Sequence, residues 1–499
     1  MTLKLNGSLW PRICKKVREN RVVTLLLIIV LVVVAGRFGY RMWIVHKIKD
    51  CNLLTQPGLS DMLPSVAGQK ILIFAPHEDD ETLGCGGYIQ KAVAAGAQVK
   101  VVLVTNGDYP EIDVVMFQRK LKMHPDEFIK LGYQRQRETL KALQYLGLPN
   151  KAVTFLGYPN HYVKAMTLPS HWLPSDPITS IRTKTSCSPY KNSLTPHAIY
   201  CGQSFLNDVE TLLLNEHPDI IITIHPNDVH HDHWPVYTVV KYALEELAAR
   251  GEPFTSKCLL WTYLIHRDSW PEPRGYWPKL NMEPPSSLVK IGNTKWVSVP
   301  LTLLETQRKR KAISFYKTQG GSIDPLLKAF ARSTELFGYV PVNRWPSGNH
   351  IPGSAVVIED PVADLMRSAM NPHGDITSVL MKRNKDRLAF DVITYKAAAS
   401  NITYHVTLHA GGVSPANRII AKYDWNSKGI SGLVMQNGEL RRPNSSDMQV
   451  STSGRITKLE VPWPLQDEST KFFMVHAWTT LGPKVIDQTA TETFVLVDN

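Results

Sequence analysis

Four apolar runs that alternate with helical patterns constrain the fold of this chain more than any other feature of its sequence. The runs are KILIFA (70–75), VKVVLVT (99–105), AVTFLG (152–157) and DIIITI (219–224). All four are continuous and rich in Val and Ile, as strands buried on both faces are. Stretches of helical periodicity lie between and after them. This alternation predicts an α/β fold, with a Rossmann-like, mostly parallel sheet and helices on both faces.

A second kind of pattern begins near residue 356. Beyond this point the sequence consists of short alternating runs, separated by turns rich in Gly, Pro, Asn and Ser. The pattern predicts a C-terminal antiparallel β-sandwich over residues 356–499. Because 499 residues are too many for one ordinary core, we expect two folded domains, an α/β domain over 69–345 and the sandwich.

The N-terminal sequence predicts a membrane anchor. Residues 1–21 contain six Lys or Arg, and the run VVTLLLIIVLVVVAG (22–36) contains no charge. These features predict a transmembrane helix over 22–45, or a signal peptide that is removed, and then a linker over 46–68. Six bases before the apolar run against four after it place the N-terminus in the cytoplasm. The two domains are then expected outside the cytoplasm, in a periplasm or the extracellular space.

Charge and cysteine usage argue against two classes of protein. The net charge is +12, but the bases form no tract interleaved with aromatic residues, so a nucleic-acid partner is not expected. The six cysteines contain no CxxC pair, which argues against a cysteine-based zinc module. Cys187 and Cys201 enclose a loop rich in Pro, Ser and Asn, and they could either form a disulfide or remain two free thiols.

Titratable residues follow two of the expected strands. HEDDE (77–81) follows KILIFA, and HPNDVHHDH (225–233) follows DIIITI. The carboxyl ends of parallel strands meet at one edge of a sheet, where ligands bind. Two histidines and one carboxylate from these groups would satisfy a catalytic zinc ion, and a second carboxylate could accept a proton from its water. The alternative for Asp79 or Asp80 is a structural role at a helix N-terminus.

Several segments together resemble one enzyme family. PHEDDETLGCGG, TNGD, RQRETLKALQYLG, FLGYP and HHDH occur in this order, and they resemble the PIG-L/LmbE-like family of zinc-dependent N-deacetylases. The resemblance covers residues 68–250, approximately. It implies a hydrolase of linear amide C–N bonds that removes acetyl from amino-sugar conjugates, such as glucosamine linked to inositol or a lipid. The cofactor that it implies is Zn²⁺, with another divalent metal such as Fe²⁺ as the alternative.

The resemblance assigns roles by position in the two main motifs. In the first motif, His77 and Asp80 match metal ligands and Asp79 matches the general base. In the second motif, His233 matches the third metal ligand. His230 matches the histidine that polarises the acetyl carbonyl and stabilises the oxyanion.

Two further positions match the family, and two depart from it. Asp232 matches the residue that orients the catalytic histidine. Arg135 matches an arginine that can face the substrate, against the alternative of a solvated surface charge. Glu78 and His231 stand where the family usually has proline, so two prolines are missing while every chemically active position is kept.

These observations predict a zinc-dependent hydrolase that deacetylates an amino sugar of a glycolipid or a cell-envelope glycan. Asp79 is expected to act as the base and His230 to stabilise the oxyanion. The expected partners are an N-acetyl amino-sugar conjugate, with a lipid-linked one among the options, and a membrane contacted through the N-terminal helix. The alternative is a non-catalytic surface protein that binds glycans on a deacetylase scaffold.

Overall fold

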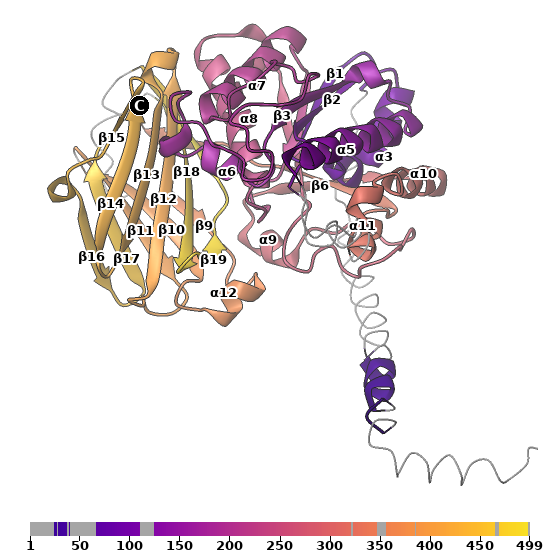
Figure 1. Ribbon diagram of the computed structural model, residues 1–499. Helices are drawn as coiled ribbons and strands as arrows, with labels where there is room; N and C mark the ends of the chain where they lie inside the picture. The colour runs from indigo at the N-terminus through magenta and orange to yellow at the C-terminus, as the bar shows by residue number, and fades with distance from the viewer. Residues whose placement is uncertain are drawn as a thin grey trace, which may run out of the picture. The chain divides into compact units, whose positions relative to one another are not determined.

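The computed structural model divides the 499-residue chain into two compact units, Met1–Gly58 and Leu59–Asn499. Both predicted domains lie in the second unit (Figure 1). The structure describes residues 24–26, 28–36, 39, 66–109, 124–320, 323–346, 356–384, 386–464 and 469–497.

The prediction of a transmembrane anchor over residues 22–45 is corrected by the structure. No helix in the described part of the chain is both long enough and apolar enough to cross a bilayer. A span needs about 20 consecutive apolar residues, and the uncharged run in the sequence is shorter than that. The predicted membrane contact, and the anchored location outside the cytoplasm, rested on this helix and are corrected with it. The basic segment 1–21 and most of the linker 46–68 lie outside the described residues, and the described residues of the apolar run do not test the signal-peptide alternative.

Seven strands form the sheet of the α/β domain. They are β1 Lys70–Ala75, β2 Gln98–Thr105, β3 Val153–Tyr158, β4 Ile220–Ile224, β5 Leu259–Tyr263, β6 Lys295–Pro300 and β7 Thr334–Tyr339. Their order is β3-β2-β1-β4-β5-β7-β6. Neighbours from β3 to β5 in this order are parallel, whereas β7 is antiparallel to β5 and β6. The four apolar runs of the sequence therefore form the parallel strands β1 to β4, and the mixed α/β architecture is confirmed.

Helices cover both faces of this sheet (Figure 1). One group packs together and consists of α3 (Asp80–Ala94), α5 (Pro125–Tyr145) and α10 (Leu303–Ile313). The other consists of α7 (Gly202–Glu216) and α8 (His233–Ala249). The strand order changes direction after β3, so right-handed crossovers place the two groups on opposite faces. Shorter helices are α6 Val163–Met166, α9 Ser286–Ile291 and α11 Asp324–Ala329.

Glycines in the first turns of α3 allow this helix to lie close to its neighbours. A Cβ atom on Gly84 would lie 2.2 Å from Cδ2 of Tyr263, and one on Gly87 would lie 2.4 Å from Cδ1 of Leu301. Such separations are far below van der Waals contact. The glycines that follow HEDDE therefore fix the helix whose N-terminus presents the acidic residues.

The connection between β3 and α7 is long and mostly irregular. It contains α6 and an isolated bridge between Cys187 and Ile199. Cys187 and Cys201 are both free thiols in this structure, so it shows the free-thiol alternative. The Tyr190 hydroxyl donates a hydrogen bond to Asp108 Oδ2 at 3.0 Å, which ties this connection to the loop after β2.

The C-terminal β-rich region is confirmed and consists of two sheets. One has the order β16-β17-β11-β10-β9, and the other β15-β14-β13-β12-β18-β20-β8, with β19 paired to β18. The strands are β8 Asn343–Pro346, β9 Val356–Glu359, β10 Ile376–Asn384, β11 Arg387–Thr394, β12 Ile402–Gly412, β13 Ile419–Asn426, β14 Gly429–Gln436, β15 Glu439–Arg441, β16 Gln449–Ser453, β17 Ile456–Pro462, β18 Thr470–Leu481, β19 Lys484–Gln488 and β20 Glu492–Val497. The first of these strands precedes residue 356, so this region takes residues from the end of the predicted α/β domain.

Helix α8 packs against the β-rich region as well as against its own sheet. It contacts β12 and β18, and Ile420 and Phe472 of the sandwich belong to the same buried apolar cluster as the α/β core. Tyr242 of α8 donates a hydrogen bond to the carbonyl of Ala410 at 2.8 Å. Arg418 pairs with Glu246 of α8 at 2.5 Å, and both side chains are buried. The helix that begins at His233 is therefore held on both of its sides.

Candidate active site

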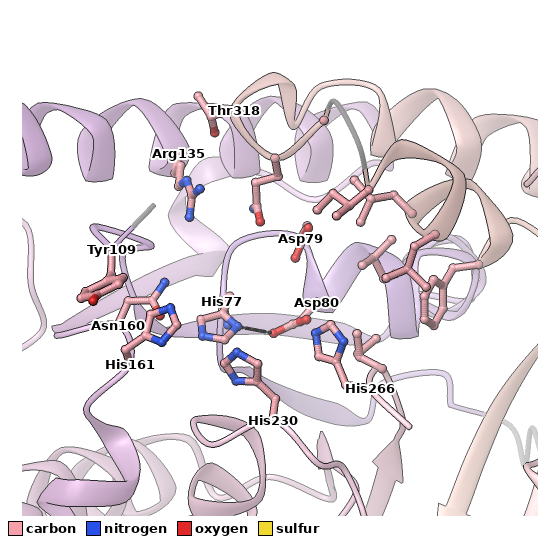
Figure 2. Close-up of a pocket in the computed structure, with 18 residues that line it drawn as sticks. His77, Asp79, Asp80, Tyr109, Arg135, Asn160, His161, His230, His266 and Thr318 are labelled. Atoms are coloured by element: carbon pink, nitrogen blue, oxygen red, sulfur yellow. Dashed lines mark hydrogen bonds and ion pairs between the residues drawn. The ribbon is translucent and has the colours of Figure 1, made fainter. Parts of the chain in front are cut away.

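The two predicted motifs meet in one cavity at the carboxyl ends of β1 and β4. The cavity has a volume of about 100 Å³. Figure 2 shows His77, Asp79 and Asp80 from the β1 side of this cavity, opposite His230 and His266. Its other walls come from the loops after β2, β3 and β5, from α3 and α5, and from residues 318–320 and 323–330; they contribute Leu83, Tyr109, Arg135, Asn160, His161, Ile265, Thr318, Gln319, Gly320, Ile323, Leu326, Leu327 and Phe330.

The three side chains predicted to bind a metal converge. Nδ1 of His77 lies 3.0 Å from Nε2 of His233. Oδ2 of Asp80 lies 3.5 Å from the first of these nitrogens and 3.3 Å from the second. The ligand atoms of a tetrahedral zinc ion, with bonds of about 2.0–2.2 Å, are roughly 3.4 Å apart. The spacing of these three atoms therefore suits a small divalent metal.

Carboxylates hold the outer nitrogens of both histidines. Nε2 of His77 lies 3.1 Å from Oδ2 of Asp232, and Nδ1 of His233 lies 3.2 Å from Oδ2 of Asp228. Ionised carboxylates only accept hydrogen bonds, so these outer nitrogens are the ones that carry protons. The nitrogens that face each other then present lone pairs, as metal-binding histidines oriented by a second carboxylate do. The donor set thus fits a divalent cation, and His230 also places a ring nitrogen within 4.8 Å of the other two histidines.

The protonation preferences of the cluster agree with this charge pattern. Burial lowers the pKa of His77, but hydrogen bonds to Asp232 and Asp80 outweigh it and raise this pKa well above its ordinary value. Burial raises the pKa of Asp80, but His233 and His77 outweigh it and lower this pKa below its ordinary value. The site therefore favours a positive charge between an ionised Asp80 and Asp232.

Asp79 lies beside these ligands with its carboxylate facing the cavity (Figure 2). It precedes α3 but makes no side-chain capping hydrogen bond, so the structural alternative of a helix cap is not what its side chain does. Its backbone φ of 121° is strained for a residue other than glycine. Burial, together with the charges of Asp80 and Glu81, raises the pKa of Asp79 well above its ordinary value. A carboxyl group with a raised pKa takes up a proton more readily than an ordinary carboxylate, as a general base must.

His230 presents a defined tautomer to the same cavity. Its Nδ1 accepts the backbone N–H of Asp232 at 3.2 Å, so Nε2 carries the ring proton. Burial and the neighbouring His233 and His77 lower the pKa of His230 well below its ordinary value. The ring is therefore neutral, with Nε2–H available as a hydrogen-bond donor.

The carboxylate of Asp232 contacts a different histidine from the one expected. The sequence comparison assigned it to orient His230, but its Oδ2 contacts His77 and accepts the N–H of His161 at 2.6 Å. Its Oδ1 accepts the N–H of Val163 at 3.0 Å. Among the described contacts, Asp232 reaches the His230 ring only through its backbone N–H. The side chain therefore holds a metal ligand and the loop after β3.

Arg135 lies in the cavity wall and is only 6% exposed. This burial disagrees with the alternative of a solvated surface charge. Burial raises the pKa of the Glu78 carboxyl to about 8, although the guanidinium of Arg135 acts in the opposite direction. Glu78, which stands where the family has proline, is fully buried below the cavity.

The sequence did not single out three residues that shape the site. His266 follows β5 and lines the cavity, so the rule that placed the two motifs at strand ends could have found it. Asp228 was part of the second motif without a role, yet its oxygens accept the backbone N–H groups of His230, Ile265 and His266 at 3.0, 3.0 and 2.8 Å. His161 lies in an aperiodic connection that offered no signal.

Comparisons with known proteins place this geometry in a family. Residues 72–244 match the family model described as PIG-L: GlcNAc-PI de-N-acetylase. A curated relative is 1D-myo-inositol 2-acetamido-2-deoxy-alpha-D-glucopyranoside deacetylase of Mycolicibacterium smegmatis, which is 40% identical over 79 residues. This match covers 16% of the present chain and 26% of the relative, so the chain spans about a quarter of its length.

Two solved structures are similar at low sequence identity. N,N'-diacetylchitobiose deacetylase from Pyrococcus horikoshii is 18% identical, with a TM-score of 0.34, and the match covers 58% of this chain and 91% of that one. The A40926 pseudoaglycone deacetylase Dbv21 is 19% identical, with a TM-score of 0.33, and the match covers 56% and 98%. The family match includes both site motifs, so residues 72–244 of the α/β domain form a PIG-L family domain.

Proposed function

We propose that this chain is a metal-dependent hydrolase that removes the acetyl group from an N-acetylated amino sugar. The observation that supports it best is the convergence of His77 Nδ1, Asp80 Oδ2 and His233 Nε2 beside the free carboxylate of Asp79. Family membership gives the reaction class, and the names of the relatives give the substrate class. Zn²⁺ is the proposed metal, because nitrogen and carboxylate ligands at this spacing suit it, and Fe²⁺ is the alternative.

When bound, such a metal lowers the pKa of water and polarises the acetyl carbonyl. We assign Asp79 as the group that takes the proton of the attacking water and returns it to the departing amine. The raised pKa of Asp79 supports this role, because a base works best when its pKa lies near the working pH. Asp232 and Asp228 keep the proton of each ligand histidine on the nitrogen that faces away from the metal.

His230 is assigned to the oxyanion. Its Nε2–H faces the cavity, and its neutral state lets it donate a hydrogen bond without first releasing a proton. A fixed donor in a site that excludes water stabilises charge that develops on the acetyl oxygen. Arg135 is assigned to the substrate, where its buried guanidinium would hold a hydroxyl or an anionic group of the sugar conjugate.

A second cavity, which adjoins the first, supports a substrate that is larger than one sugar. It has a volume of about 530 Å³ and shares His230 and His266 with the catalytic cavity. Met366 and Arg367 of the β-rich region line its outer part, and Met366 is 68% exposed. We propose that the N-acetyl sugar occupies the catalytic cavity while the rest of a glycolipid or cell-envelope glycan lies between the two domains.

Acetate release by the purified chain tests the function. With Zn²⁺ supplied, the native protein is expected to deacetylate at least one class among free N-acetyl sugars, envelope glycans and glycolipids. Asp79→Asn should retain the metal and lose at least about a hundredfold in kcat, in line with the contribution of a general base. The matched control is Asp391→Asn, which changes a buried aspartate of the sandwich. If the protein binds a glycan but releases no acetate with any metal supplied, the result favours the glycan-binding alternative. Full turnover by the Asp79→Asn variant would refute the assignment of the base.

A further inference from the structure

Three aspartates that do not line the catalytic cavity turn their carboxylates toward one another. They are Asp360, which follows β9, Asp364, which precedes the short helix α12 (Met366–Met370), and Asp487 in β19. One oxygen from each lies within 4.8 Å of the others. They come from separate segments at one end of the β-rich region, near α12 in Figure 1.

The oxygens of this carboxylate cluster divide into anchored and free ones. Oδ2 of Asp364 pairs with Arg267, and Oδ2 of Asp487 accepts the backbone N–H of Ile376 at 2.7 Å. The Oδ1 atoms of both residues are buried and have no hydrogen-bond partner among the described residues. Asp360 is only 3% exposed, and neither of its oxygens has such a partner. Four buried carboxylate oxygens of this cluster therefore lack a hydrogen-bond partner among the described residues.

Such an arrangement is costly unless a positive charge lies among the oxygens. A buried carboxylate without a partner loses the hydration that it has in the unfolded chain. When all three are ionised, the carboxylates and the guanidinium of Arg267 sum to a charge of −2, and Asp375 lies beside them as a fourth carboxylate. Burial and this mutual repulsion raise the pKa of Asp360 and of Asp487 well above the ordinary value. A divalent cation would neutralise the core of the cluster. Oxygen-only ligands of this kind are those that hard cations such as Ca²⁺ and Mg²⁺ prefer.

We propose that Asp360, Asp364 and Asp487 bind a hard divalent cation, with Ca²⁺ as the best match. The anchored oxygens of Asp364 and Asp487 fix these two carboxylates in position, and the unpartnered oxygens of all three aspartates supply up to four protein ligands. Ca²⁺ takes six to eight oxygen ligands in a flexible geometry, so water completes its shell. This site is separate from the metal of the proposed hydrolase and does not depend on that function.

The cation would join the β-rich region to a loop that supports the catalytic cavity. Arg267, the partner of Asp364, donates a hydrogen bond to the carbonyl of Asn227 at 2.9 Å. The next residue, Asp228, contacts His233, and its carbonyl accepts a bond from Gln488 at 3.4 Å. Binding at the carboxylate cluster would therefore stabilise the contact between the sandwich and the loop after β4.

Calcium titration of the full chain tests the proposal. The protein is treated with chelator, reloaded with one equivalent of Zn²⁺, and titrated with Ca²⁺ up to about 5 mM, since sites with few ligands bind at roughly 10⁻⁴–10⁻³ M. Calorimetry and metal analysis should show one further cation per chain, and the thermal midpoint should rise with Ca²⁺. Asp360→Asn should weaken this binding at least about tenfold, because affinity follows the charge of the ligands. Asp391→Asn is the control, since Asp391 pairs instead with Lys382 at 3.0 Å.

Two results would overturn the proposal. In the first, the native protein reloaded with zinc takes up neither Ca²⁺ nor Mg²⁺, and neither cation changes its thermal midpoint. This result would mean that the aspartates share protons instead of binding a cation. This measurement needs no variant, so it decides the question even if the Asp360→Asn protein does not fold. The other is an Asp360→Asn protein that folds and binds Ca²⁺ as tightly as the native chain.

Discussion

Replacing Asp232 with asparagine is expected to weaken metal binding about 10- to 100-fold, the usual effect of losing a carboxylate that orients a metal ligand. Oδ2 of Asp232 contacts Nε2 of His77 and the N–H of His161, and Oδ1 accepts the N–H of Val163. Asparagine has one oxygen and one NH₂ group. If the asparagine oxygen keeps the contacts with His77 and His161, its NH₂ group faces the N–H of Val163. Both of these groups are hydrogen-bond donors, so this contact is lost.

The expected loss corresponds to about 1.4–2.7 kcal/mol of metal-binding free energy. It arises because a neutral amide no longer increases the basicity of the ligand nitrogen on His77. The hydrogen bond to Asp232 is the strongest influence that raises the pKa of His77, so this pKa should fall in the variant. Leaving one buried N–H group unpaired costs a further ~1–3 kcal/mol of folding stability.

Competition with a chromophoric chelator measures the zinc affinity of the native and variant proteins between pH 6 and 8. Since the proton on His77 must leave before a metal binds, affinity should rise with pH in the native protein and less steeply in the variant. Asp208→Asn is the matched control: this buried carboxylate accepts bonds from Tyr158 and Thr195 and lies outside the cavity. An Asp232→Asn protein with native zinc affinity would refute the reasoning about the histidine tautomers.

Three further predictions concern the contacts between the domains. Arg418→Met should cost roughly 1.5–3 kcal/mol in urea unfolding, because Glu210 and Glu246 lose one of their two arginine partners and keep only Arg250, whereas Lys382→Ala, a partly exposed pair, should cost under about 1 kcal/mol. Burial raises the pKa of Glu492 to about 7, so its contribution to stability is full below about pH 4.5 and falls by up to ~3 kcal/mol as the pH rises through 7. Glu492→Gln should remove this part of the pH profile in urea titrations, and an unchanged profile would contradict it. Arg367→Ala or Met366→Ala should raise KM severalfold for an extended conjugate but not for a free N-acetyl sugar, and equal effects on both would count against the second cavity as a subsite.

The sequence predicted the parts of the site that follow directly from strand order. Continuous apolar runs locate parallel strands, and parallel strands bring their carboxyl ends together, so HEDDE and HHDH had to approach each other. The sequence separation of 156 positions between His77 and His233 did not obscure this, because both belong to segments that follow neighbouring strands of the sheet. Their assignment as ligands came from the family resemblance and remains a proposal.

Contacts between side chains of different loops could not be predicted in the same way. The partner of Asp232 depends on how the connection after β3 folds back, and that connection has no periodicity. The membrane prediction failed for another reason: it lengthened a run of apolar residues past Arg37, whereas the described helices contain no span of sufficient length.

The β-rich region is part of the structural support of the site. The alternation of apolar and polar residues along its strands shows which side chains point inward, but it does not reveal that one sheet packs against α8. That helix begins with the proposed metal ligand His233, and its next four turns are buried between the parallel sheet and strands β12 and β18. Arg418 pairs with Glu246 of the helix together with Arg250, and the carbonyl of Ala410 accepts the hydroxyl of Tyr242. A ligand at the first turn of a helix moves with the whole helix, so the sandwich determines the position of His233 as much as the α/β sheet does.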